Sequence, residues 1–253
     1  MSKIERDSTH IHYEATGTDA PVLLTHGFAA TSRIWRAQVD PFASRNQFIR
    51  WDMRGHGRSG SPPDDASYSV DETVDDMAAL LDHLGHERAI IGGHSLGGYM
   101  ALAFHLKYPE RVKALFVVAT GPGYRSDEPR QEWNEMARGL ARRLERNGLE
   151  ELSKLDREME PTEHDSVRGL SQAARGMLVQ HDSRIIDSLP DIDVPTLVVV
   201  GEKDRGYVDS SKYMSEKISG AERVSIPNAG HAVYMHQTEL FNEAAMKFFE
   251  RVA

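Results

Sequence analysis

The chain has 253 residues, a length that suits one α/β domain of ordinary size or two small domains. Lysine and arginine number 30 against 39 acidic residues, and the formal net charge of −9 argues against a nucleic-acid-binding protein. The absence of cysteine excludes disulfides, thiolate metal sites and a cysteine nucleophile. The sequence has no run of about 20 apolar residues and no apolar signal-peptide core after Met1, so we expect a cytoplasmic protein that does not bind membranes.

Short apolar runs alternate with helical patterns along the chain. This alternation predicts an α/β fold in which helices wrap a mostly parallel sheet. Several runs are apolar without alternation, as is typical of strands that are covered on both faces. Residues 9–16 alternate more clearly and are expected to form part of an antiparallel edge. The other predicted strands are residues 21–25, 47–51, 88–92, 112–118, 196–200 and 223–226.

Helix signals are clearest in the first half of the chain. Ser69 and Glu72 have the spacing of a capping box, and an apolar stripe over residues 70–84 predicts a helix that Gly85 ends. Two further helices are expected over residues 95–109 and 240–249.

Residues 121–190 interrupt this alternation with a densely charged segment. Apolar residues recur in it at helical spacing, and Pro161 breaks the pattern, so we expect two to four short amphipathic helices. Those apolar residues are Trp133, Met136, Leu140, Leu144, Val167, Leu170, Ala174 and Met177. An insertion of this length is expected to cap a site, and the alternative is a helical layer of the main domain. The predicted division is therefore a core of residues 1–120 and 191–253, with a cap over residues 121–190.

The sequence GHSLGG at residues 93–98 follows a predicted strand and begins a predicted helix. A strand, a tight turn and a helix are the context of a nucleophile elbow, and Gly93 and Gly97 allow the backbone to turn tightly around Ser95. Ser95 would also lie at a helix N-terminus, where developing negative charge is favoured. The alternative interpretation is a glycine-rich turn with an inert serine.

A serine nucleophile needs a base, and the base needs a carboxylate that orients it. His231 is the predicted base because it lies in a loop that follows the last strand, where ligand chemistry collects in open α/β sheets. Asp204 is the predicted acid because it follows the buried strand at 196–200, with Glu202 and Asp209 as rivals. His236 falls where the final helix should begin and is expected at the surface.

An oxyanion hole needs two backbone N–H groups that point at the developing charge. Leu96, directly after Ser95, is expected to supply one of them. Phe28 is expected to supply the other, because the sequence HGF at residues 26–28 follows the strand at 21–25 and Gly27 allows a close turn.

These motifs together resemble those of the α/β-hydrolase superfamily, along nearly the whole chain. The chain is most similar to small capped members such as carboxylesterases, 3-oxoadipate enol-lactonases and cofactor-free haloperoxidase-like enzymes. The resemblance implies an eight-stranded, mostly parallel sheet with one antiparallel strand, and a cap after the sixth strand. It also implies that the loop at 52–59 is structural, so that Arg54 and His56 are not catalytic. The matching segments are residues 26–28, 52–59, 93–98, 201–204 and 230–231.

The expected chemistry is hydrolysis of a small-molecule ester or lactone through an acyl-enzyme. Ser95 at the nucleophile position argues against haloalkane dehalogenases and epoxide hydrolases, which the resemblance associates with Asp there. Two alternatives stay open: a carbon–carbon bond hydrolase of a diketone-like substrate, and a signal-binding protein of this fold with little turnover. His94 before the nucleophile favours esters, because carbon–carbon hydrolases more often carry Asn there.

The substrate itself is not predicted by the fold or the triad. Trp35, Tyr124, Trp133 and Met136 are the candidate lining of an apolar pocket. The sequence has no dinucleotide fingerprint and no metal-ligand spacing, so we expect no cofactor and no metal. The oligomeric state cannot be inferred from these patterns.

Overall fold

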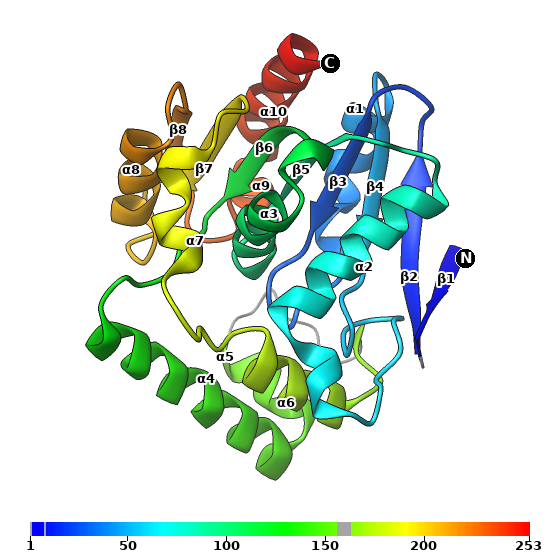
Figure 1. The fold of residues 1–253 in the computed structure, drawn as a ribbon, viewed down its shortest axis with the longest axis vertical. Coiled ribbons are helices and arrows are strands. Elements are labelled where there is room, and N and C mark those ends of the chain that lie inside the picture. Colours follow the sequence, from blue (N-terminus) through cyan, green and yellow to red (C-terminus); the bar gives the residue numbers. More distant parts are fainter. Residues whose placement is uncertain (1, 8, 156–162) are drawn as a thin grey trace.

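The computed structural model describes residues 2–7, 9–155 and 163–253. Within them an eight-stranded sheet has the order β1-β2-β4-β3-β5-β6-β7-β8, with helices on both faces (Figure 1). β2 pairs antiparallel with both of its neighbours, and all pairs from β4 to β8 are parallel. The predicted architecture is therefore confirmed. The strands are β1 (Ser2–Arg6), β2 (Thr9–Thr16), β3 (Pro21–Thr25), β4 (Gln47–Trp51), β5 (Ala89–His94), β6 (Val112–Val118), β7 (Thr196–Gly201) and β8 (Glu222–Ile226).

The edge of the sheet contains one strand more than the residue patterns predicted. β2 lies in the antiparallel edge as expected, but a strand that was not predicted from the residues, β1, pairs with its outer side from Ser2 opposite Tyr13 to Arg6 opposite Thr9. In β1, Ile4 is the buried residue and its neighbours are largely exposed. An edge strand of this kind has almost no apolar signal, which is why the sequence pattern did not reveal it.

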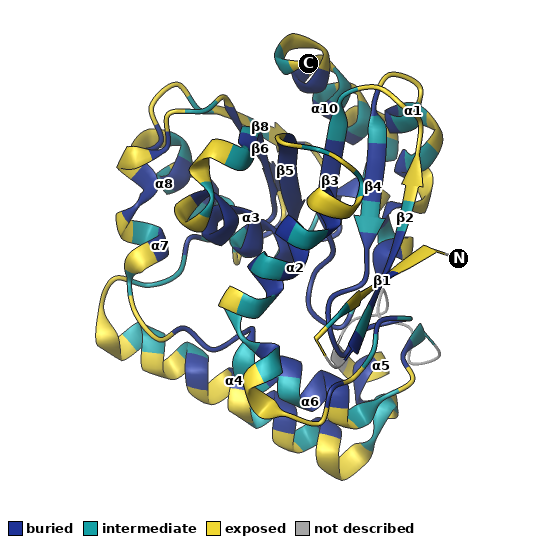
Figure 2. Ribbon diagram, turned by 45° about the vertical axis from the view of Figure 1, so that its right-hand side comes forward, coloured by how far each residue is buried: buried dark blue, intermediate teal, exposed yellow. Residues whose placement is uncertain are grey.

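Successive residues of the central strands point to opposite faces of the sheet. In β3, Leu23 packs in the apolar cluster under α2, α3 and α8, whereas Val22 and Leu24 pack in the cluster under α1 and α10. Because both faces are covered, the central strands are almost entirely buried and consist mostly of apolar residues without alternation (Figure 2). The helices of these two layers are α1 (Val39–Ala43), α2 (Val70–His83), α3 (Leu96–Lys107), α8 (Val208–Lys217), α9 (Val233–His236) and α10 (Thr238–Val252).

One half of the predicted capping box at the start of α2 is present. The Ser69 hydroxyl accepts a hydrogen bond from the Glu72 backbone N–H at 3.1 Å. The Glu72 carboxylate instead lies 3.3 Å from the Arg54 guanidinium, which is 2% exposed and also donates two hydrogen bonds to Asp76. Arg54 thus joins the loop after β4 to α2, which supports the structural interpretation of that loop.

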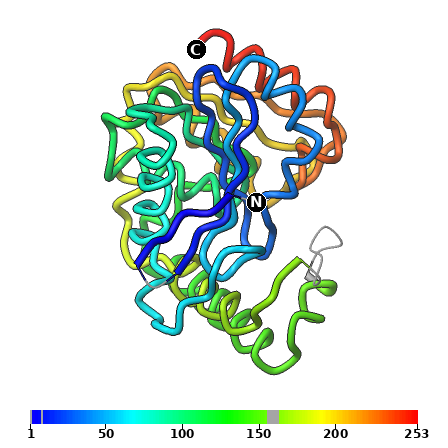
Figure 3. The backbone as a smooth tube through the Cα atoms, turned by 90° about the vertical axis from the view of Figure 1, so that its right-hand side faces the viewer, coloured from blue at the N-terminus to red at the C-terminus, as the bar shows by residue number. Residues whose placement is uncertain are grey.

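Within residues 121–190, which connect β6 to β7, the first three described α-helices form a layer across the carboxyl ends of the strands, whereas the fourth packs beside α3 (Figures 1 and 3). The helices are α4 (Asp127–Asn147), α5 (Leu152–Leu155), α6 (Val167–Gly176) and α7 (Arg184–Asp187). α4 has 21 residues, so it is longer than the short helices that were expected. Its buried residues Leu140 and Leu144 pack in one cluster with Leu170 and Ala174 of α6. The break expected at Pro161 lies outside the described residues.

Candidate active site

Ser95 lies between β5 and α3 in a strained backbone conformation, with φ of 52° and ψ of −117°. Such a conformation costs about 1–3 kcal/mol and persists only when neighbouring structure enforces it. The Ser95 N–H donates to the Val118 carbonyl at 2.9 Å, and the Ser95 carbonyl accepts from the Thr120 hydroxyl at 2.7 Å. Both backbone groups of Ser95 are thereby attached to β6 and the residues after it.

Glycines allow α3 to begin directly against the sheet. A Cβ atom on Gly97 would lie 2.2 Å from the Thr25 carbonyl oxygen, and one on Gly93 would lie 2.5 Å from the Gly97 carbonyl carbon. Real Cβ atoms do not approach this closely, so no larger residue fits without movement of the backbone. The first turn of α3 therefore depends on these two glycines.

His231 and Asp204 form a hydrogen-bonded pair. His231 Nδ1 lies 2.9 Å from Asp204 Oδ2, and Asp204 is 7% exposed. His94 Nε2 donates to the His231 carbonyl at 3.1 Å, and the two rings are 4.6 Å apart between centroids. The residue before Ser95 thus holds the loop that carries His231.

The rival residues lie elsewhere. Glu202 is exposed and accepts from the Asn228 N–H at 3.3 Å, and Asp209 is exposed on α8. His236 is exposed, as expected, and its Nδ1 accepts from the Gly230 N–H at 3.0 Å. Among the described residues, no hydrogen bond of ordinary geometry joins the Ser95 hydroxyl to His231, and such bonds are often long before substrate binds.

The loop after β3 lies against the elbow. A Cβ atom on Gly27 would be 3.0 Å from His94 Nδ1 and 3.3 Å from Ser95 Cβ. The next residue, Phe28, is buried, and its backbone N–H has no acceptor within the described part of the chain. The same holds for the N–H of Leu96 at the start of α3, so both predicted oxyanion donors are available.

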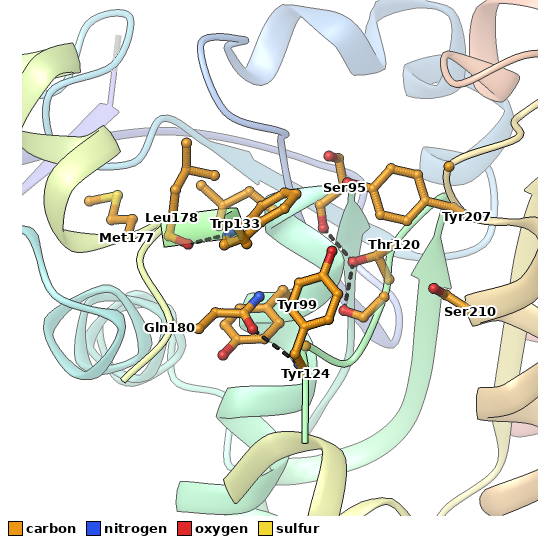
Figure 4. A pocket seen from close by; sticks show the side chains of 14 residues that line it. Ser95, Tyr99, Thr120, Tyr124, Trp133, Met177, Leu178, Gln180, Tyr207 and Ser210 are labelled. Carbon is orange, nitrogen blue, oxygen red and sulfur yellow. Dashed lines mark hydrogen bonds between the residues drawn. The ribbon is translucent and has the colours of Figure 1, made fainter. Parts of the chain in front are cut away.

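A cavity of about 270 Å³ opens beside Ser95, and its lining combines aromatic and aliphatic side chains with uncharged polar ones (Figure 4). Tyr124 and Trp133, from the inserted segment, line it together with Tyr99 and Leu96. The Trp133 indole N–H donates to the Leu178 carbonyl at 2.6 Å, which fixes the ring at the wall of the cavity.

The predictions for Trp35 and Met136 need correction. Trp35 is fully buried on the other face of the sheet and packs against Tyr234 and Phe241. Met136 is 44% exposed on the outer side of α4. Neither residue lines the cavity, because an apolar side chain in a pattern does not reveal which layer it packs in.

Tyr207 is a site residue that sequence reasoning missed. Its ring stacks on that of His231 with 5.0 Å between centroids, and its side chain lies beside Ser95 (Figure 4). Burial raises the pKa of Tyr207, while hydrogen bonding with Ser95 acts in the opposite direction. The sequence feature that could have identified Tyr207 is its position three residues after Asp204, in a loop at the carboxyl end of a strand.

The described residues contain no group of three or more His, Asp or Glu side chains that could hold a metal ion. No helix within the described ranges is long and apolar enough to cross a membrane.

Comparison with known proteins agrees with this geometry. A family model described as the alpha/beta hydrolase fold matches residues 20–180. The thermophilic esterase from Thermogutta terrifontis is 31% identical, with a TM-score of 0.84 over 96% of this chain and 94% of that one. Est816, described as an N-acyl homoserine lactone degrading enzyme, is 30% identical, with a TM-score of 0.78 over 98% of this chain and all of its own. A Bacillus subtilis (strain 168) protein is 27% identical over 94% of this chain and 93% of its own, and is provisionally named 2-succinyl-6-hydroxy-2,4-cyclohexadiene-1-carboxylate synthase.

The chain belongs to the α/β-hydrolase family, because the family model covers more than half of it. It is an enzyme of the hydrolase class, similar over nearly its full length to an esterase and to a lactone-degrading enzyme. The resemblance inferred from the motifs is therefore confirmed.

A glycine-to-alanine substitution should have opposite effects on stability in α3 and in α4. Gly97→Ala should lower the free energy of unfolding by about 1–3 kcal/mol or more, because the new methyl group overlaps the Thr25 carbonyl. Gly139→Ala, in α4, should raise it by about 0.5–1 kcal/mol, because alanine favours a helix and its Cβ would meet no atom closer than 3.7 Å. Urea unfolding of both variants measures the difference. Equal stability of the two variants would contradict the close packing described for the elbow.

Proposed function

We propose that the protein is a serine hydrolase that cleaves a small carboxylic ester or lactone. Ser95 is the nucleophile, His231 the general base and Asp204 the carboxylate that orients it. The observation that carries this proposal is the convergence of three features: the strained serine, the histidine–aspartate pair and the cavity that opens beside the serine. The order Ser, Asp, His along the chain is that of this family's triads.

The reaction proceeds in two halves. His231 Nε2 takes the proton of the Ser95 hydroxyl as its oxygen attacks the ester carbonyl carbon. The tetrahedral intermediate collapses, the C–O bond to the leaving group breaks, and His231 protonates the departing oxygen. Water then attacks the acyl-enzyme with His231 again as the base. The bond from the acyl carbon to the Ser95 oxygen breaks, His231 returns a proton to that oxygen, and the carboxylic acid is released. Throughout the reaction the Nδ1–H of His231 donates a hydrogen bond to the Asp204 carboxylate. This bond keeps the proton on Nδ1, so that Nε2 is free to act as the base.

The negative charge on the carbonyl oxygen is stabilised by the N–H groups of Phe28 and Leu96. Two observations support this role: neither N–H has another acceptor among the described residues, and the backbone at Gly27 lies too close to Ser95 to leave free space for a Cβ atom. Removal of one such donor typically costs about 2.7–4 kcal/mol of transition-state stabilisation. The Tyr207 ring, stacked on His231, restricts the rotation of the imidazole.

The cavity favours a small, neutral substrate with an apolar or aromatic group. Its described lining side chains carry no formal charge, and Tyr99, Tyr124, Trp133 and Tyr207 supply aromatic surface. A carboxylate, such as the one in the compound that names the Bacillus subtilis relative, would lose its hydration here without a cationic partner among these residues. Esters and lactones, to which the names of two relatives point, lack that cost.

Residues 121–190 act as the cap of this site, and residues 1–120 and 191–253 as its core. The segment supplies Tyr124, Trp133 and Leu178 to the wall of the cavity, whereas Ser95, Asp204 and His231 come from loops of the core. The cap therefore selects substrates by shape and polarity.

The assignment of the acid is tested by two matched substitutions. Asp204→Asn should lower kcat by about 10⁴-fold, because an amide leaves His231 in the wrong tautomer. Asp209→Asn, exposed on α8, should leave kcat within about threefold of the wild type, since surface changes away from a site have small effects. Both are measured with a panel of 4-nitrophenyl esters of graded acyl length, with Ser95→Ala protein as the blank. A tolerant Asp204 with a large loss at Asp209 would refute the assignment.

The role of the cap is tested by two residues of one helix. Trp133→Ala should change the ranking of substrates by acyl length, because a lost pocket contact is worth about 1–3 kcal/mol between substrates. Met136→Ala should leave the ranking unchanged, since that side chain faces outward from α4. Values of kcat/KM across the ester panel show the ranking. A uniform loss on every ester for Trp133→Ala would mean that the indole supports the fold instead.

A further inference from the structure

His164 connects the inserted segment to two loops of the core. It lies just before α6, whose first turn is capped by the Ser166 hydroxyl, and it is 4% exposed. One ring nitrogen, Nδ1, accepts a hydrogen bond from the Gly57 N–H at 3.1 Å. The other, Nε2, therefore carries the proton and donates to the Ala29 carbonyl at 2.9 Å. Both nitrogens of this buried ring are thus used.

The carbonyl that His164 holds belongs to a strained residue. Ala29 has a φ of 55°, in the left-handed region that residues with a Cβ atom avoid. It follows Phe28 directly, and the Ala30 N–H closes the turn on the Gly27 carbonyl at 3.2 Å. Strain of this kind persists only where surrounding contacts enforce it. The hydrogen bond from His164 is such a contact, and it comes from outside the core.

A neighbouring contact ties the same segment to the same loop. The Thr31 hydroxyl donates to the Glu163 carboxylate at 2.6 Å, and Arg33 lies 3.6 Å from that carboxylate. From the core side, Asp52 accepts from the Ser32 N–H at 2.7 Å. The loop after β3 is therefore held between the core and the inserted segment.

The bonds of His164 require a neutral imidazole, because a protonated ring has no acceptor for the Gly57 N–H. Burial lowers the pKa of His164 and keeps the ring neutral. The carboxylates of Glu163, Asp52 and Asp165 and the Ala29 carbonyl act in the opposite direction.

We propose that His164 is a positioning residue for the oxyanion hole: its Nε2–H holds the Ala29 carbonyl, and through it the Phe28 peptide, in the conformation that the reaction needs. The inference rests on the proposed function. It adds that the inserted segment contributes to the chemical step as well as to substrate choice, although every residue proposed for the triad and oxyanion hole lies outside that segment.

Two substitutions separate the two bonds of His164. In glutamine the amide nitrogen is the same number of bonds from Cβ as Nε2 is in histidine, so its N–H can keep the hydrogen bond to the Ala29 carbonyl. In asparagine the amide oxygen is the same number of bonds from Cβ as Nδ1 is in histidine. It can keep the hydrogen bond from the Gly57 N–H, but the bond to Ala29 is lost. His164→Asn should lower kcat by about 10- to 100-fold with KM within about threefold, which is less than the loss of a whole oxyanion donor. His164→Gln should restore most of that kcat, to within about threefold of the wild type.

A buried histidine away from the loop serves as the control. His105 is 5% exposed near the C-terminal end of α3, about 15 Å along the helix from Ser95. His105→Asn should change the melting temperature without the selective loss of kcat. A merely structural role for His164 would lower the melting temperature of the Asn and Gln variants alike, with no difference between their kcat values.

The outcomes distinguish this inference from the proposed function. Ester turnover in the wild type that does not depend on Ser95 would overturn both. Turnover that depends on Ser95 but is equal in His164→Asn and His164→Gln would overturn the inference alone. If His164→Asn does not fold, it is combined with Ala29→Gly, since glycine adopts a positive φ without support. The double variant should keep kcat within about threefold of Ala29→Gly alone, and a loss of tenfold or more would contradict the strain argument.

Discussion

Ser95 adopts a backbone conformation that a residue with a side chain keeps only when its neighbours enforce it. This conformation is enforced by the packing of α3 on the sheet. At Gly93 and Gly97 the neighbouring backbone lies so close that a Cβ atom would overlap it. Because β5 is central and fully buried, this turn cannot relax without disturbing the core on both faces. The hydroxyl is thus presented at the carboxyl ends of the strands, where the neighbouring loops reach it.

The other parts of the site are positioned relative to this turn by residues that do no chemistry. His94 precedes the turn and donates to the carbonyl of His231, so the loop after β8 is tied to the elbow. A Cβ atom on Gly27 would crowd His94 and Ser95, so the loop after β3 packs closely against the same two residues. Tyr207 stacks on His231 from the loop that carries Asp204. A change at this turn would therefore displace both the loop that carries the proposed base, His231, and the loop that carries Phe28.

Much of this fold follows from local sequence patterns, because strands covered on both faces are continuous apolar runs and the elbow has a distinctive glycine spacing. β1 escaped prediction because a solvated edge strand has almost no apolar signal. The candidate triad and the Phe28 loop could be chosen from their positions after strands. Trp35, Met136 and Tyr207 could not be placed correctly, since the side of a helix or loop that meets a cavity is set by tertiary packing. The bond from His164 to Ala29 joins residues 135 positions apart, and no local pattern indicates it.

The proposal that Ser95 is an activated nucleophile is tested by reaction with an organophosphate such as diethyl 4-nitrophenyl phosphate. Phosphorylation by this compound requires an activated serine that is accessible from the cavity. We expect release of 4-nitrophenol up to one equivalent per chain, a phosphoryl adduct on the peptide that contains Ser95, and loss of ester turnover in proportion to labelling. An adduct on another residue, or full turnover by fully labelled protein, would contradict this proposal.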